Sequence, residues 1–307
     1  MVQHCSKMRG NDKLSRNDCQ QERTGDFFNP LEGVSSEAME KRRSVSGSVQ
    51  CVNRALDLLL RLADVSRDLD LTELARRSDL TKSTTSRLLS TMQQRGFVRQ
   101  HPTSQRFSFG PELIRLGAIA KQQLGLTDLF HPFLEQLMQA TGETASLALL
   151  DNNQAVYVDQ VQSSSMIRFF PPIGTHVPLH CTAVGKVLLS DLSPEHLSQV
   201  IEQGLRPYTP NTILDPVELQ RALEQVKERG FAVDLEEIEL GGHCIAAPVL
   251  DNRQKVIAAM GISGPRLRVT SKRLPELAQI VKTIAGQASA ELNFNQDRTN
   301  RKQGVNQ

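Results

Sequence analysis

The stretch TKSTTSRLLSTMQQRGF, residues 81–97, has the pattern of a short amphipathic helix with a marked start and end. Thr81 is a favourable N-cap, because its hydroxyl accepts a hydrogen bond from an unpaired amide of the first helical turn. Gly96 is typical of the residue that follows a helix, since glycine adopts a left-handed backbone conformation without strain. The face suited to burial, at helical spacing, comprises Thr85, Leu88, Leu89 and Met92.

The neighbouring segments predict a winged helix-turn-helix around this helix. Residues 49–63 and 71–75 carry apolar side chains at helical spacing, with Thr72 as the expected N-cap of the second helix. After the opening stretch, residues 97–100 and 106–110 have the pattern of two short strands joined by the turn-forming HPTSQ.

The third helix of such a module enters the DNA major groove with its N-terminal residues. Residues 48–110 hold ten Lys or Arg against six Asp or Glu, a local charge of +4 (10 − 6) that suits phosphate contacts. The alternative is a three-helix domain that binds another protein. The expected DNA contacts are hydroxyls and cations outside the buried face, with one cation on the wing: Lys82, Ser83, Thr84, Ser86, Arg87 and Arg106.

The rest of the chain predicts a linker and an α+β domain. Residues 111–126 form an expected linker helix whose exposed apolar stripe invites self-association. Residues 127–293 alternate helical and strand patterns, which predicts an antiparallel sheet with helices on its faces. One expected strand is SMIRFF, residues 165–170. The flanking segments 1–47 and 294–307 are polar, and we expect a disordered tail and a polar tail there.

The composition excludes several classes of protein. No run of about 18 apolar residues exists, so no membrane span is expected. The first residues lack the apolar region of a signal peptide, and the five cysteines are an odd, dispersed set without a disulfide pattern. We therefore expect a cytoplasmic protein. Its net charge of +2 means that nucleic-acid binding must depend on local charge.

The dipeptide His-Cys occurs twice, in PLHCTAVGK (178–186) and GGHCIAAPV (241–249). Two His and two Cys are the ligands of many zinc sites, and Cys181 beside a base is a candidate nucleophile. A strand would direct His243 and Cys244 to opposite faces, which disfavours a shared metal, and no oriented third group for catalysis is suggested. Two interpretations remain open: buried apolar cysteines, or a binding site where the helix start at TAVGK offers free amides to a carboxylate. We expect no metal, cofactor or catalytic residue.

The run DLEEIE, residues 234–239, is acidic. Paired carboxylates can bind a metal or act as an acid–base pair, but such a run is more often a solvated strand face. Asp234 is the one member that we single out.

Five motifs, in this order, resemble the IclR family of bacterial transcription regulators, and the resemblance covers about residues 48–293. The motifs are LTKSTTSRLLSTMQQRGFV (80–98), ATGETASLALLD (140–151), PIGTHVPLHCTAVGKVLL (172–189), ELGGHCIAAPVLD (239–251) and GISGPRLR (261–268). The resemblance implies a winged helix-turn-helix at 48–110, a linker helix at 111–126 and a GAF-like α+β effector-binding domain at 127–293. It also implies a dimer or tetramer on double-stranded, palindromic operators and a small metabolite effector, often a carboxylate.

The resemblance places the effector between the helix start at TAVGK and the inner face of the sheet. Matching positions are three polar side chains, two backbone amides and an apolar wall: Asp234, Cys244 and Ser263; Ala183 and Val184; Met166, Phe169 and Val177. The chain departs from the family where Gly-Gly-His-Cys replaces Gly-Leu-Arg-Cys at 241–244. It also has Gly261 where a Ser is common, which removes a polar contact and adds room. Phe169 and Phe170 would suit a larger or aromatic ligand.

We therefore predict a ligand-responsive DNA-binding transcriptional regulator, repressor or activator, of a catabolic or metabolic operon. The metabolite would shift two winged helices relative to each other through the linker. The alternative from another class is a small-molecule enzyme that uses Cys181 and carries an accessory helical domain. A third interpretation is a constitutive DNA-binding protein whose second domain serves only assembly.

Overall fold

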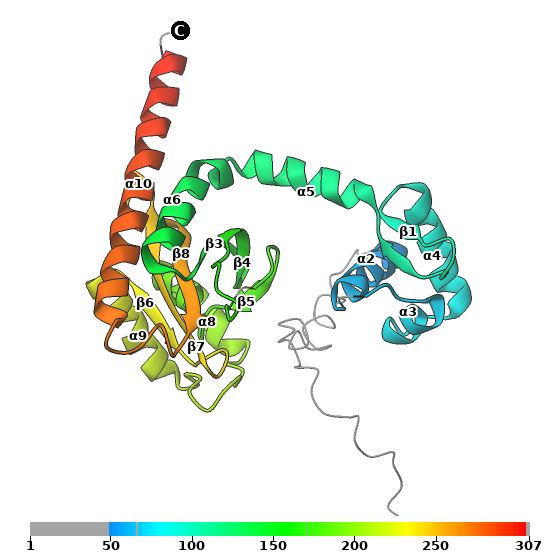
Figure 1. Cartoon of the computed structure of the whole chain (residues 1–307), viewed down its shortest axis with the longest axis horizontal. Coiled ribbons are helices and arrows are strands. Elements are labelled where there is room, and N and C mark those ends of the chain that lie inside the picture. The colour runs from blue at the N-terminus through cyan, green and yellow to red at the C-terminus, as the bar shows by residue number, and fades with distance from the viewer. Residues whose placement is uncertain (1–48, 66, 170, 305–307) are drawn as a thin grey trace, which may run out of the picture.

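The computed structural model describes residues 49–304 apart from positions 66 and 170. The expected N-terminal tail and Phe170 lie outside the described residues. Figure 1 shows one unit at each end of the helix α5 (Pro111–Leu124).

The N-terminal unit is the predicted winged helix-turn-helix. Its elements are α2 (Gln50–Ala63), α3 (Leu71–Arg77), α4 (Lys82–Gln94), β1 (Val98–Gln100) and β2 (Phe107–Phe109). One apolar cluster joins the three helices to the hairpin, because each element contributes the residues of a single face. This cluster buries Leu58, Leu62, Leu69, Leu74, Leu89, Met92, Val98 and Phe107.

The helix starts follow capping chemistry, with one correction. Thr81 caps α4 as predicted, and its hydroxyl accepts a hydrogen bond from the Thr84 amide at 3.3 Å. The expected cap Thr72 is wrong, because Asp70 caps α3 by accepting from the Glu73 amide at 2.9 Å. A carboxylate is the better acceptor there, since its charge also complements the positive end of the helix dipole.

The wing is held against the helices by backbone contacts. Strands β1 and β2 pair antiparallel, and Leu69 bridges to Phe107. The chain leaves the wing at Gly110, where a Cβ would lie 2.0 Å from the carbonyl oxygen of Gly96. Only glycine permits this close approach, which fixes where α5 begins. Helix α5 ends at Gly125, in a left-handed conformation (φ 63°), so the helix predicted over 111–126 breaks there.

The C-terminal unit contains a six-stranded antiparallel sheet of order β5-β4-β3-β8-β7-β6 (Figure 1). The strands are β3 (Thr144–Asp151), β4 (Gln154–Val161), β5 (His176–Pro178), β6 (Ala232–Leu235), β7 (Gly242–Leu250) and β8 (Val256–Pro265). The hairpin predicted to turn at DNRQ is confirmed as β7–β8. The prediction of a strand at 165–170 is wrong, because residues 165–169 form no strand. The short edge strand β5 was not predicted.

Helices cover both faces of this sheet, as the alternating pattern predicted. One face packs against α6 (Leu126–Thr141) and α10 (Leu274–Gly304), with Phe130 and Leu277 in the core. The other packs against α7 (Ala183–Ser190), α8 (Pro194–Glu202) and α9 (Pro216–Arg229). Helix α10 continues past Phe294, through residues that we expected to be a polar tail. Among the described helices none is long and apolar enough to cross a membrane.

Candidate functional site

The first candidate site is the exposed start of α4. Thr85, Leu89 and Met92 are buried, which fixes the rotation of the helix about its axis. The Thr85 hydroxyl donates to the Thr81 carbonyl, within the same helix, at 3.0 Å. Thr84 is half-buried and receives a hydrogen bond from the Thr81 hydroxyl at 2.9 Å, so its hydroxyl is partly committed to capping. The remaining predicted contacts on α4 are exposed: Lys82, Ser83, Ser86 and Arg87.

The wing adds cations to this surface. Arg106 is exposed beside β2, as predicted. Arg99 on β1 is also exposed and donates to the Ser108 hydroxyl at 3.0 Å. Arg99 was not among the predicted DNA contacts. Its position next to the buried Val98 in a strand indicates an outward side chain, because neighbouring strand residues point to opposite faces.

The cations of α3 form ion pairs, and in this they differ from the cations of α4. Glu73 forms ion pairs with Arg76 and Arg77, and the hydrogen bonds from these guanidinium groups lower the pKa of Glu73 to about 2. In the part of the chain that the structure describes, no ion pair is recorded for Lys82 or Arg87. Their charge is therefore available to an external anion such as a DNA phosphate.

The second candidate site is a polar row that crosses four strands of the C-terminal sheet. Asp234 pairs with Cys244, Cys244 with Ser263, and Ser263 with Thr144. Paired residues of an antiparallel sheet point to the same face, so the four side chains form one row. Asp234, Ser263 and Thr144 are buried, whereas Cys244 keeps partial solvent access. The row unites the three polar residues predicted for the effector and adds Thr144.

Helix α7 begins on the same side of the sheet as this row. The Thr182 hydroxyl accepts from the Gly185 amide at 3.1 Å and donates to the Pro178 carbonyl at 2.7 Å. Among the described residues, no partner is recorded for the amides of Ala183 and Val184, which are buried. Two such amides at the positive end of a helix suit an anionic oxygen.

Buried charge accompanies the row. The ammonium of Lys186 lies 2.5 Å from Glu237 Oε1, and both side chains are buried. Asp234 is fully buried, and burial together with the nearby Glu237 raises its pKa to about 7. The acidic run is therefore not a solvated strand face, because Asp234 and Glu237 point into the protein. Lys186 was overlooked because its neighbours in sequence are apolar.

The side chains of the two His-Cys dipeptides have separate surroundings. His243 Nδ1 lies 2.7 Å from the Val269 carbonyl and His180 Nε2 lies 3.1 Å from the Arg206 carbonyl. Burial raises the pKa of the Cys181 and Cys244 thiols well above the usual range, which opposes formation of a nucleophilic thiolate. Over residues 49–304, without 66 and 170, no cluster of three metal-ligand side chains occurs.

The predicted apolar wall is only partly assembled. Val177 is buried, and Phe169 is half-buried with its ring over Gly242, where a Cβ would come within 3.2 Å of the ring. Met166 is 97 % exposed, so this structure does not bring it to the polar row. Phe170 lies outside the described residues.

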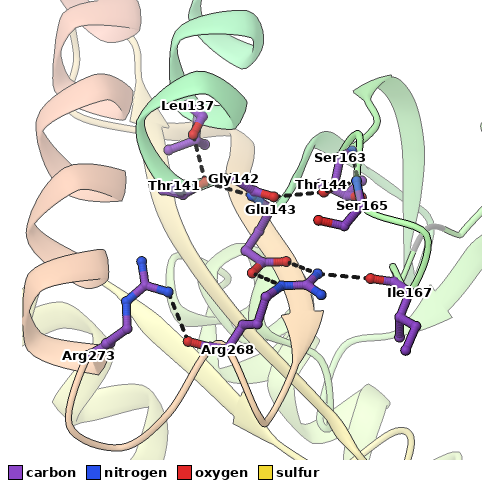
Figure 2. Close-up of polar contacts among 10 residues, drawn as sticks. All are labelled: Leu137, Thr141, Gly142, Glu143, Thr144, Ser163, Ser165, Ile167, Arg268 and Arg273. Carbon is purple, nitrogen blue, oxygen red and sulfur yellow. Dashed lines mark hydrogen bonds and ion pairs between the residues drawn. The ribbon is translucent and has the colours of Figure 1, made fainter.

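A buried ion pair holds the segment that carries Met166 (Figure 2). Arg268 donates to both oxygens of Glu143, at 2.6 and 2.7 Å, and to the Ile167 carbonyl at 2.9 Å. The segment is also attached at Ser163, whose hydroxyl donates to the Gly142 carbonyl at 2.7 Å. Glu143 and Arg268 thus position residues 163–167, a role that sequence reasoning missed.

Comparisons with known proteins place both units of the chain in one family. The family model "IclR helix-turn-helix domain" matches residues 52–102, and "Bacterial transcriptional regulator IclR C-terminal" matches residues 119–290. The acetate operon repressor of Salmonella typhimurium is 40 % identical over 240 residues, 77 % of this chain and 88 % of its own length. The transcriptional repressor IclR of Escherichia coli is 39 % identical over 239 residues, 77 % of this chain and 87 % of its own length.

Solved structures show the same architecture. The IclR of Thermotoga maritima aligns with a TM-score of 0.66 and 30 % identity, over 78 % of this chain and 98 % of its own. An IclR-type regulator from Alicyclobacillus acidocaldarius aligns with a TM-score of 0.70 and 29 % identity, over 80 % of this chain and 100 % of its own.

Proposed function

Because this chain belongs to the IclR family of bacterial transcriptional regulators, we propose that it reads an operator with α4 and changes its DNA affinity when a small carboxylate binds beside α7. The chain is a DNA-binding transcriptional regulator, as its relatives are. The raised thiol pKa of Cys181 and the regulatory activity of the relatives leave the enzyme alternative without support.

The DNA-binding proposal rests on the exposed start of α4. The buried face of α4, at Thr85, Leu89 and Met92, leaves four side chains facing outward: Lys82, Ser83, Ser86 and Arg87. Cations and short hydroxyls at a helix N-terminus suit phosphates and base edges in the major groove. Arg106 and Arg99 on the wing extend the contact to the flanking backbone, and Thr84 contributes with the part of its hydroxyl not used in capping.

The effector proposal rests on the polar row opposite two unpaired amides. The amides of Ala183 and Val184 bind the carboxylate, and Cys244, Ser263 and Asp234 bind its second oxygen or an adjacent polar group. Val177 and Phe169 supply apolar contact, whereas Met166, exposed to solvent, is not part of the proposed site. A structural neighbour from Microbacterium hydrocarbonoxydans was solved with 4-hydroxybenzoate; at 22 % identity that likeness shows the fold alone, so the carboxylate class depends on this chain's own residues.

Self-association through α2 and α5 is part of the proposal. Both helices expose large apolar side chains, which monomeric proteins usually cover. The exposed set at helical spacing is Val49, Val52, Leu56 and Leu60 with Ile114, Leu116 and Ile119. A dimer would present two α4 helices to a palindromic operator in the cytoplasm, and a tetramer would present two such pairs.

The test is sequencing of genomic DNA fragments captured by the full chain. The variant Lys82→Ala/Arg87→Ala is compared with a matched variant, Arg221→Ala/Lys227→Ala, which removes two exposed cations from α9. We expect discrete, near-palindromic sites for the wild type and the α9 variant, and their loss in the α4 variant. Equal capture by all three proteins would contradict α4 as the reading element.

A further inference from the structure

An unbalanced charge lies beside the proposed carboxylate site. Three ionisable groups are enclosed together: Lys186 on α7, Glu237 after β6, and Asp234 on β6. Lys186 is matched with Glu237 by their ion pair. Asp234 is therefore a carboxyl group for which this cluster holds no second cation, and a charge buried without a partner is strongly disfavoured.

The two oxygens of Asp234 differ. Oδ1 accepts from the Glu237 amide at 2.8 Å. Oδ2 is buried without a hydrogen-bond partner among the described residues. A protonated carboxyl group could use Oδ2 as an O–H donor, whereas an ionised one would leave a bare negative oxygen in the protein interior.

The groups around Asp234 supply no further charge. Tyr157 on β4, Cys181 before α7 and Cys244 on β7 interact electrostatically with Asp234, and burial raises the pKa of all three, so they are neutral near pH 7. Ser263 and Thr144 complete the row as neutral hydroxyls. Burial also lowers the pKa of His180, so its neutral form is favoured.

We propose that binding of a carboxylate effector is coupled to the uptake of one proton by Asp234, whose Oδ2–H then donates to the effector. This inference rests on the proposed function, because it needs a carboxylate beside α7. A proton from water adds to Oδ2, no covalent bond breaks, and the effector's negative charge enters a cluster with no excess charge. Without the proton, two adjacent carboxylates and Glu237 would face the single cation Lys186, which like-charge repulsion opposes.

The coupling predicts a definite pH profile. In the effector-free protein the pKa of Asp234 lies at about 7, and in the complex Asp234 stays protonated. About half a proton is therefore taken up per effector at pH 7 and close to one at pH 8.5. The dissociation constant is then nearly constant below pH 6 and rises about tenfold per pH unit above about pH 7.5.

The experiment is titration calorimetry of the full chain at pH 7 and 8.5, in PIPES, HEPES and Tris buffers. The probes are acetate, lactate and 4-hydroxybenzoate, with acetamide, lactamide and 4-hydroxybenzamide as uncharged counterparts. The slope of observed enthalpy against buffer ionisation enthalpy counts the protons taken up. We expect positive slopes for each carboxylate that binds, larger at pH 8.5.

Two variants separate the possible causes. Asp234→Asn keeps a donor at this position but cannot titrate, so its slope should be zero and its affinity independent of pH. Asp128→Asn, at an exposed carboxylate of α6, should behave as the wild type. Carboxylate binding by the wild type with zero slope at both pH values would overturn the inference and leave the proposed function intact. Failure of all three carboxylates to bind would instead contradict the proposed effector class.

Discussion

Replacing Arg268 by Met should destabilise the C-terminal unit because it leaves Glu143 without its cation. Glu143 is 1 % exposed, and its two carboxylate oxygens bind Arg268 at 2.6 and 2.7 Å. Removing one partner of a buried pair costs about 3–5 kcal/mol. The Arg268 side chain is 33 % exposed, so water can reach part of the space, and we expect the lower end, about 3 kcal/mol. Replacing both partners, in Glu143→Gln/Arg268→Met, should recover at least half of the loss.

Urea unfolding followed by tyrosine fluorescence measures this directly. The chain has no Trp and only two Tyr, Tyr157 and Tyr208, so the signal reports the C-terminal unit. The matched control is Arg266→Met, because Arg266 is 58 % exposed and its contact with Glu236 is long, at 3.4 Å. That pair should contribute little to stability, because water screens it. If Arg268→Met lost no more stability than Arg266→Met, the Glu143–Arg268 pair would not stabilise the C-terminal unit.

Three further predictions follow from named contacts. Lys82→Ala/Arg87→Ala should reduce the steepness of log affinity against log salt concentration by about 1.8, since each phosphate contact contributes about 0.9. Fluorescence anisotropy of labelled operator DNA at several salt concentrations measures this slope, and an unchanged slope would argue against phosphate contact. Burial raises the folded-state pKa of Asp234 to about 7, so its contribution to stability is fully present only below the unfolded pKa and is lost as the pH rises to about 7. Urea unfolding should therefore show the stability of Asp234→Asn relative to the wild type rising from pH 4 to pH 7 and levelling off above pH 7, and a constant difference would exclude the shift. Ile114→Asp on the exposed face of α5 should move the chain toward monomer in sedimentation velocity, whereas persistence of the wild-type assembly would exclude that face from the interface.

Local patterns were enough to predict the elements with strong end signals. The hydroxyl of Thr81 and the glycine at position 96 mark the ends of α4, and the turn at DNRQ separates two apolar strands. Such signals depend on neighbours in the chain, which a sequence displays directly. The α+β architecture follows from them once helical and strand patterns alternate.

Contacts between residues far apart in the chain could not be predicted from the sequence. Glu143 and Arg268 are 125 positions apart, and only the folded sheet shows that they meet. Residues 165–169 have apolar strand-like composition, yet they form an irregular segment tied by that pair. Lys186 sits inside an apolar helix, and its use became visible only when Glu237 was found beside it.

The most direct test of effector-controlled DNA binding measures operator affinity with and without effector. An operator taken from the captured genomic sites is titrated with the full chain, in the presence and absence of the carboxylate that binds most tightly by calorimetry. We expect a change of at least several-fold in the wild type, and no such change in a variant whose site no longer binds that carboxylate. A ligand shifts the equilibrium only by its differential affinity for the two states. A carboxylate that saturates the C-terminal unit and leaves operator affinity and half-site spacing unchanged would contradict effector control of DNA binding.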